Sequence, residues 1–465
     1  MNLHRDILRL AVPSILANIT VPLVGMVDIA VAGHLGASGG IGAAALIGGI
    51  SIGSMLFDML YWNFGFLRGG TGGLTAQAYG RYLASSKDAS QAGVQEAETD
   101  IALTLKRALS IAFGSGLFLV ALQWVVVQVA FLLVDCSPEV QTLATQYFYI
   151  RIWAAPATLS LFAFKGWFIG MQDTVRPMIC DLLVNATNIL LSIGLGFGYA
   201  GLPALGFAGV AYGTLIAQWT GFVYASIAVW RRYGQYFKDA RTARNAAGWR
   251  AFFVLNRDLF LRSVCMIAVY IGFTMISARY GDMMLAVGAI LMKLLMIFSY
   301  FTDGFAYAGE ALTGRFIGEK NHEGVMSTIR QTFVWSLGVT GLFFLVYGVG
   351  GVPLLRLMTS DPSVVEAGRE FIPWLLLMPV IGCPAFTWDG IFTGATASKD
   401  LRNSTVWCVV GFFAVWFAGI GLLEAFRSSV PEPLAIHLLM AAYFTHLFVR
   451  ALYLTLRWRK AIPLA

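Results

Sequence analysis

The sequence predicts an all-α polytopic membrane protein, in which twelve transmembrane helices form two parallel-repeat six-helix lobes around a central cavity. Three observations favour this architecture. First, 58% of the 465 residues are hydrophobic and only 12% are charged, which is more apolar surface than a water-soluble globule can bury. Second, apolar segments long enough to cross a bilayer recur along the chain. Third, short motifs of the first half return in the second half.

Twelve apolar segments account for the predicted transmembrane helices. Each has the length of about 20 mostly apolar residues that crosses the hydrocarbon core of a bilayer. The first is longer than the apolar core of a cleavable signal peptide, so we expect it to stay in the membrane. In order, the segments span 10–33, 41–67, 108–134, 143–168, 178–200, 205–230, 259–280, 284–308, 331–357, 371–394, 404–424 and 433–456.

The positions of Lys and Arg predict the orientation of these helices. If both termini are cytoplasmic, most of the 32 Lys and Arg side chains fall on the cytoplasmic face, as the positive-inside rule requires. We therefore expect a multi-pass protein of the cell inner (plasma) membrane with cytoplasmic N- and C-termini. The exceptions are Lys293, inside a predicted helix, and five arginines of the opposite face: Arg151, Arg279, Arg356, Arg369 and Arg427.

The net positive charge of the chain indicates which partners to expect. The net charge of +7 follows from this asymmetry between the two faces. The basic stretch RRYGQYFKDARTARNAAGWR (231–250) is suited to anionic lipid headgroups. We expect the lipid bilayer as its surroundings, no nucleic-acid partner and a monomer.

Internal repeats divide the chain into two halves. GGLTAQAYG (72–80) and EALTGRFIG (310–318) share LT and the closing Gly, and GWFIGMQDT (166–174) and GIFTGATAS (390–398) share the pattern G-x-F-x-G. Because each half holds an even number of helices, both halves enter the membrane in the same direction. The predicted domains are an N-terminal lobe over 1–230, a cytoplasmic basic linker over 231–256 and a C-terminal lobe over 257–465.

Four stretches of the chain occur in an order that is specific to one family of transporters. They are ILRLAVPSILANITVPLVGMVDIAVAGHLG, LRGGTGGLTAQAYGR, DGFAYAGEALTG and WDGIFTGATAS. Together they resemble the multidrug and toxic compound extrusion (MATE) family, and within it the DinF-like branch. The resemblance covers essentially the whole chain. It implies a secondary active antiporter that exports small, drug-like organic compounds, often cationic, against an inward flow of protons or sodium.

Asp28 lies in the middle of the first predicted helix, within VPLVGMVDIAVAGHLG (21–36). A charged side chain near the bilayer centre costs roughly 2.5 to 3.5 kcal/mol on insertion scales, so a carboxylate retained there is a candidate functional group. Loss of hydration favours the neutral form, which allows proton exchange. A hydrogen bond that only fixes helix packing is the structural alternative. Asp28 matches the first-helix Asp of the MATE family, and the resemblance implies that it binds the coupling ion.

The fifth predicted helix carries a polar stripe. Asp181, Asn185, Asn188 and Ser192 in CDLLVNATNILLS are spaced 4, 3 and 4 apart, which places them on one helical face. Lipid cannot satisfy these amides, so the stripe must face protein or water. The two Asn residues resemble a family pair on this helix. For Asp181, a solvated charge at the helix start and a role in ion access are equally compatible with the sequence.

The choice of coupling ion depends on Ser192. Archaeal-type relatives carry a second carboxylate where this chain has Ser192, and the missing charge disfavours a sodium site. We therefore expect H+ as the coupling ion, with Na+ as the alternative if further oxygens come from residues such as Thr214. Pro13 and Pro22 interrupt the backbone hydrogen bonds of the first helix, so we predict that they act as a hinge when Asp28 is protonated. A static kink is the alternative.

The second half carries different charges. Lys293 lies inside the eighth predicted helix, Asp303 and Glu310 follow on one face, and Asp389 ends the tenth. A buried Lys must be neutral or paired, so we expect a partner such as Asp389, Asp303 or Asp58. Asp303, Glu310 and Asp389 match DinF-like motifs and are further functional candidates, although their closeness to helix ends also suits a structural role.

The chain contains no catalytic motif. Its five histidines are scattered, and HExxH and GxxxxGK are absent. We expect no enzyme activity, no metal site and no cofactor beyond the coupling ion. A lipid-linked saccharide flippase of similar architecture is the alternative function. That flippase would need a basic cavity able to hold pyrophosphate.

Overall fold

The computed structural model describes residues 2–38, 42–134, 136–237, 246–359, 361–426 and 431–462. Within these ranges every regular element is a helix, and 11 helical stretches are long and apolar enough to cross a membrane. The remaining predicted segment, 205–230, corresponds to α9 (Phe207–Tyr233), which is less apolar. The predicted all-α class is therefore confirmed. Lys238, Arg241 and Arg244 of the predicted linker, and Arg427, lie outside the described residues.

The described residues of the first half form nine α-helices, several of them joined by short 3-10 turns. In order, these elements are α1 (Leu3–Ser38), α2 (Ala43–Trp62), η1 (Asn63–Gly65), α3 (Phe66–Lys87), α4 (Gln91–Ala121), α5 (Gln123–Leu133), α6 (Pro138–Arg151), η2 (Ile152–Ala154), α7 (Ala155–Gly170), α8 (Val175–Phe197), η3 (Tyr199–Gly201), α9 and η4 (Gly234–Phe237).

The second half is built in the same way from longer helices. They are α10 (Ala246–Ala278), α11 (Asp282–Gly318), α12 (His322–Met358), α13 (Pro362–Arg369), α14 (Ile372–Gly394), α15 (Ser398–Phe426) and α16 (Glu432–Ala461). Most helices in both halves extend beyond the predicted apolar segments. The reason is that hydropathy marks only the part of a helix that suits hydrocarbon, whereas backbone hydrogen bonding continues into polar ends.

Contacts between Cα atoms divide the chain into two compact units. One unit is Leu16–Trp249, and the other combines Met1–Ile15 with Arg250–Ala465. The predicted lobes differ from these units at the start of α1. Gly304 of α11 explains the difference, because a Cβ atom there would come within 2.9 Å of the Ala11 carbonyl oxygen. The start of α1 therefore packs closely on α11, and Trp335 Nε1 donates to His4 Nδ1 over 3.2 Å.

The sequence repeat corresponds to the same helix crossing within each unit. In the first unit α7 crosses α3 at Gly166, where a Cβ atom would lie 2.1 Å from the Arg68 carbonyl oxygen. In the second unit α14 crosses α11 at Gly390, where a Cβ atom would lie 2.0 Å from the Ala306 carbonyl oxygen. The G-x-F-x-G motif thus marks backbone-to-backbone contact in both halves, which explains why glycine stands there.

Candidate functional site

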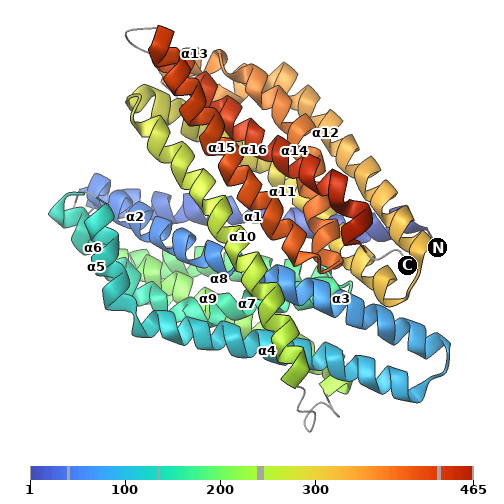
Figure 1. Cartoon of the computed structure of the whole chain (residues 1–465). Helices are drawn as coiled ribbons and strands as arrows, with labels where there is room; N and C mark the ends of the chain where they lie inside the picture. The colour runs from blue at the N-terminus through green and yellow to red at the C-terminus, as the bar shows by residue number, and fades with distance from the viewer. Residues whose placement is uncertain are drawn as a thin grey trace. The chain divides into compact units, whose positions relative to one another are not determined.

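The α8–α9 pair of the first unit forms the scaffold of the predicted ion site. The two helices lie side by side (Figure 1) because glycines of α9 face the α8 backbone. A Cβ atom at Gly209 would come within 2.5 Å of the Leu195 carbonyl oxygen, and one at Gly213 within 2.8 Å of the Ser192 amide nitrogen. This close approach brings the short polar side chains of the two helices into hydrogen-bonding range.

Asp28 of α1 meets the polar stripe at Ser192. The Ser192 hydroxyl donates to Asp28 Oδ1 over 3.0 Å. Only 5% of Asp28 and 0% of Ser192 is exposed. No cationic group comes within 4.0 Å of Asp28 in the described part of the chain. The site therefore holds a buried carboxylate that has a neutral hydrogen-bond donor and no direct ion-pair partner.

Asn188 and Thr214 lie one turn away and form a second pair. Asn188 Nδ2 donates to Thr214 Oγ1 over 2.8 Å, and Thr214 Oγ1 donates to the Val210 carbonyl oxygen over 3.3 Å. Both side chains are buried. The Asn188 Oδ1 atom has no hydrogen-bond partner among the described residues, so one acceptor remains available beside this pair.

The other two stripe residues turn to different neighbours. Asn185 Nδ2 donates to Thr20 Oγ1 of α1 over 2.8 Å. Asp181 accepts from Lys165 Nζ of α7 over 2.8 Å, and both side chains are half-buried. Asp181 therefore forms an ion pair with Lys165 and does not contribute to the hydrogen bonds around Asp28.

The two prolines of α1 lie within one continuous helix. Pro13 and Pro22 both fall inside Leu3–Ser38, which carries no interruption. Next to Pro13, the Ser14 hydroxyl donates to the Leu10 carbonyl oxygen over 3.0 Å. Each proline still lacks a backbone donor, and the hinge stays a prediction.

Arg151 is a charged residue of the first unit whose placement sequence reasoning missed. The charge count assigns it to the opposite face, yet it lies within the helical stretch Pro138–Gly170, which is a candidate membrane span. Its Nη1 atom donates to Tyr147 OH over 3.0 Å and to Ser54 Oγ over 3.3 Å. The sequence did indicate this placement, because Arg151 falls inside the predicted apolar segment 143–168.

A separate ionic cluster occupies the second unit. Asp389 of α14 forms ion pairs with Arg262 of α10 and with Arg450 of α16. Arg450 is 1% exposed, and its Nε donates to Asp389 Oδ1 over 3.0 Å. The predicted pairing of Asp389 with Lys293 is therefore wrong. Both arginines were counted as cytoplasmic from the sequence, yet they fall inside the predicted segments 259–280 and 433–456, where they pair with Asp389.

The remaining candidates of the second unit lie apart from one another. Lys293 is exposed and not buried, because it shares the outer face of α11 with Ala289 and Ile297, while Leu291 and Leu294 face the core. Asp303 is half-buried and interacts electrostatically with Arg450. Glu310 is 0% exposed, and its carbonyl oxygen faces Gly394 at the α11–α14 crossing. The prediction that Lys293 is buried and paired with a carboxylate is therefore wrong, because its side chain is exposed.

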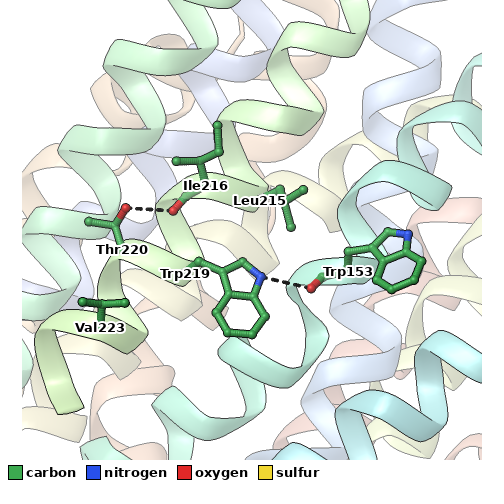
Figure 2. A pocket seen from close by; sticks show the side chains of 6 residues that line it. All are labelled: Trp153, Leu215, Ile216, Trp219, Thr220 and Val223. Carbon is green, nitrogen blue, oxygen red and sulfur yellow. Dashed lines mark hydrogen bonds between the residues drawn. The ribbon is translucent and has the colours of Figure 1, made fainter.

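An apolar pocket of about 600 Å³ opens on η2 and α9. Figure 2 shows Trp219 pointing its ring nitrogen toward the Trp153 carbonyl oxygen, a hydrogen bond of 3.2 Å. The lining contains no charged side chain, so this pocket offers no carboxylate for a coupling ion. It is formed by Trp153, Leu215, Ile216, Trp219, Thr220 and Val223. In the described ranges, no three His, Cys, Asp or Glu side chains gather to hold a metal ion.

Known proteins resemble this chain in sequence along almost its whole length. It is 32% identical to "DNA damage-inducible protein F" of Escherichia coli (strain K12), over 97% of this chain and 91% of that protein. It is 23% identical to "Probable multidrug resistance protein NorM" of Thermotoga maritima, over 90% of this chain and 84% of that protein.

Solved structures share the fold. A structure described as "MATE in the bent conformation" superposes with a TM-score of 0.79 at 16% identity, covering 99% of this chain and 96% of that one. A second, "MATE in the straight conformation", gives a TM-score of 0.77 at 16% identity, covering 99% and 97%.

The sequence model of the MatE family matches residues 13–194 and 259–415, which is most of the chain. The match includes the α1 and α8 residues of the Asp28 site and the Asp389 position of the second unit. Family, fold and near full-length similarity to a DinF protein all agree with the resemblance noted in the sequence. The chain therefore belongs to the MatE family of multidrug efflux transporters, and within it to the DinF-like branch.

Proposed function

We propose that this transporter exports organic cations or cationic amphipathic compounds in exchange for protons, and that Asp28 binds the coupling proton. The observation that carries the proposal is the buried Asp28 carboxylate, which has Ser192 as a hydrogen-bond donor and no cation within 4.0 Å among the described residues. We further propose that it works in the plasma membrane, as a monomer, with both termini in the cytoplasm.

The chemistry of the site favours a proton over sodium. A proton removes the Asp28 charge, and a neutral carboxyl group can sit among apolar neighbours at little further cost. Sodium would leave a dehydrated ion held by one carboxylate and by neutral oxygens. Asn188 Nδ2 is already bonded to Thr214 Oγ1, and the Asn188 carbonyl oxygen that remains carries no charge, so it is a poor substitute for a second carboxylate.

The prolines of α1 supply a way to couple protonation to movement. We propose that protonation of Asp28 weakens its attachment to α8 and lets α1 bend near Pro13 and Pro22. The bend would narrow the first-lobe cavity and release the solute outward, and deprotonation on the cytoplasmic side would reset the helix. Two solved structures of the same fold are described as MATE in the bent and in the straight conformation.

The test is transport by Asp28→Asn in proteoliposomes. Asn keeps the volume and much of the hydrogen bonding but cannot exchange a proton. With tetraphenylphosphonium as the substrate, a pH gradient without sodium should drive uptake by the unchanged protein and not by the variant. Asp181→Asn, which removes a carboxylate already paired with Lys165, is the matched control. Normal pH-driven transport by Asp28→Asn, or transport that requires sodium, would refute the proposal.

A further inference from the structure

Helix α1 takes part in both compact units. Residues Met1–Ile15 group with the second unit, and the chain from Leu16 onward belongs to the first. The helix itself, Leu3–Ser38, runs across this boundary without a break. Asp28 therefore lies on a continuous helix whose start belongs to the other unit. A displacement of the part that carries Asp28 must pass along this helix to its start or bend it.

The start of α1 packs tightly within the second unit. Ile7 and Ala11 are 0% exposed, and Leu10 is 3% exposed. Gly304 of α11 permits this packing, since a Cβ atom there would lie 2.4 Å from Ile15 Cγ1 and 2.9 Å from the Ala11 carbonyl oxygen. Any larger side chain at this position would push the Ile15 side chain and the α1 backbone away from α11.

A second contact holds the first turns of α1. Trp335 of α12 donates from Nε1 to His4 Nδ1 over 3.2 Å, and the two rings meet edge to face with their centres 6.3 Å apart. The Trp335 ring also stacks on Phe305 of α11, with 6.1 Å between centres and 9° between planes. Phe305 follows Gly304 directly in the sequence, so both contacts fix α1 to the same turn of α11.

The part of α1 that lies in the first unit is held differently. Leu16, Val21 and Met26 are 51%, 53% and 66% exposed, so one side of this stretch is open to its surroundings. Thr20 and Asp28 attach it to α8 by side-chain hydrogen bonds. Close backbone packing thus fixes the start of α1, while polar side-chain bonds, one of them to the proposed proton site, hold the part that carries Asp28.

We propose that Gly304 is a positioning residue of the transport cycle, because it fixes the start of α1 in the second unit and so makes the movement of α1 act on both units. The inference rests on the proposed function, in which protonation loosens Asp28 from α8 and α1 bends. Since α1 is attached in both units, a change in its bend must either break one attachment or displace one unit against the other. With a loosened start, protonation would bend α1 without driving the change that carries the substrate across.

The experiment measures binding and turnover separately for Gly304→Ala. Tetraphenylphosphonium binding to the purified protein over a range of pH reports on the Asp28 site. The midpoint of this binding should equal that of the unchanged protein, because the substitution alters no group at the site. Tetraphenylphosphonium uptake into proteoliposomes, driven by a pH gradient, reports on turnover. Uptake should fall by about tenfold, within the range typical of coupling between distinct sites.

Gly419→Ala is the matched control for a loss of stability. Its Cβ atom would also meet a side-chain atom of the second unit at 2.4 Å, which is Leu438 Cδ1 at the α15–α16 contact. It should lower the thermal unfolding midpoint to a similar extent as Gly304→Ala and leave turnover per folded protein unchanged. The double variant Gly304→Ala/Ile15→Ala removes the closest overlap, so it should recover part of the lost turnover.

Three results would overturn the inference: unchanged turnover in Gly304→Ala, an equal loss of turnover in Gly419→Ala, or a binding midpoint that shifts in Gly304→Ala. Trp335→Phe provides a second variant if Gly304→Ala does not fold. It retains an aromatic ring beside Phe305 and removes the donor to His4, so it should lower turnover and keep the binding midpoint. Unchanged turnover in Trp335→Phe refutes the inference equally.

Asp28→Asn distinguishes a failure of this inference from a failure of the proposed function. If Asp28→Asn still transports in response to a pH gradient, the proposed function fails whatever Gly304→Ala does. If Asp28→Asn is inactive while Gly304→Ala transports like the unchanged protein, only the inference about Gly304 fails.

Discussion

Alanine at Gly390 should destabilise the second unit, because it would force α14 away from α11. The added Cβ atom would lie 2.0 Å from the Ala306 carbonyl oxygen, whereas carbon and oxygen at such helix crossings normally stay about 3.3 Å apart or more. The obstacle is a backbone atom of a packed helix, which cannot rotate aside as a side chain would. One helix must therefore shift by more than 1 Å along much of the crossing.

The size of the effect follows from two opposing contributions. Overpacking typically costs about 1 to 3 kcal/mol of stability. Because the obstacle at this site is a rigid backbone atom, we expect a cost at the upper end of that range. Alanine regains about 1 kcal/mol of helix propensity relative to glycine. The expected net loss is thus about 2 kcal/mol. Gly166→Ala should lose a similar amount in the first unit, because its Cβ atom would meet the Arg68 carbonyl oxygen at 2.1 Å.

The assay is the thermal unfolding midpoint of the purified proteins in detergent. Gly338→Ala is the control, because a Cβ atom at that helical position meets nothing within 4 Å. The control should match the unchanged protein or exceed it, while Gly390→Ala and Gly166→Ala should both unfold at lower temperature. Equal midpoints for all three variants would show that the repeated motif does not mark a close helix crossing.

Two further predictions concern charge. Ser192→Asp puts a second carboxylate beside Asp28, so it should introduce sodium-dependent transport in proteoliposomes, and transport that stays indifferent to sodium would contradict the site chemistry. Asp389→Asn leaves Arg262 and Arg450 without their shared anion, so it should cost about 3 to 5 kcal/mol of stability. A thermal midpoint unchanged from the parent protein would show that this ionic cluster contributes little to the fold.

The helical class and the repeat could be predicted because both depend on local patterns. A run of about 20 apolar residues identifies a span without knowledge of its neighbours. Two glycines four residues apart lie on one face of a helix, so G-x-F-x-G indicates a close contact even before its partner is known. The sequence could not show that the contacts are the carbonyl oxygens of Arg68 and Ala306, because these lie on other helices.

The polar stripe of α8 could be predicted as a stripe but not as one site. Its residues, from Asp181 to Ser192, extend over about 16 Å of helix. A stripe of that length passes several neighbouring helices. Asp181 therefore meets Lys165 of α7, Asn185 meets Thr20 of α1, and only Ser192 reaches Asp28. Helical spacing fixes the face on which a side chain lies, while tertiary packing decides its partner.

The charged residues depend most strongly on tertiary structure, and they distinguish the two units. In the second unit Arg262 and Arg450 both contact Asp389, so a proton arriving there would have to break two ion pairs. In the first unit no cationic group lies within 4.0 Å of Asp28 among the described residues, and a proton can neutralise the carboxylate without breaking an ion pair. A carboxylate that exchanges protons in each transport cycle needs this second arrangement, which is why we propose that Asp28 couples transport to protons and that Asp389 supports the structure.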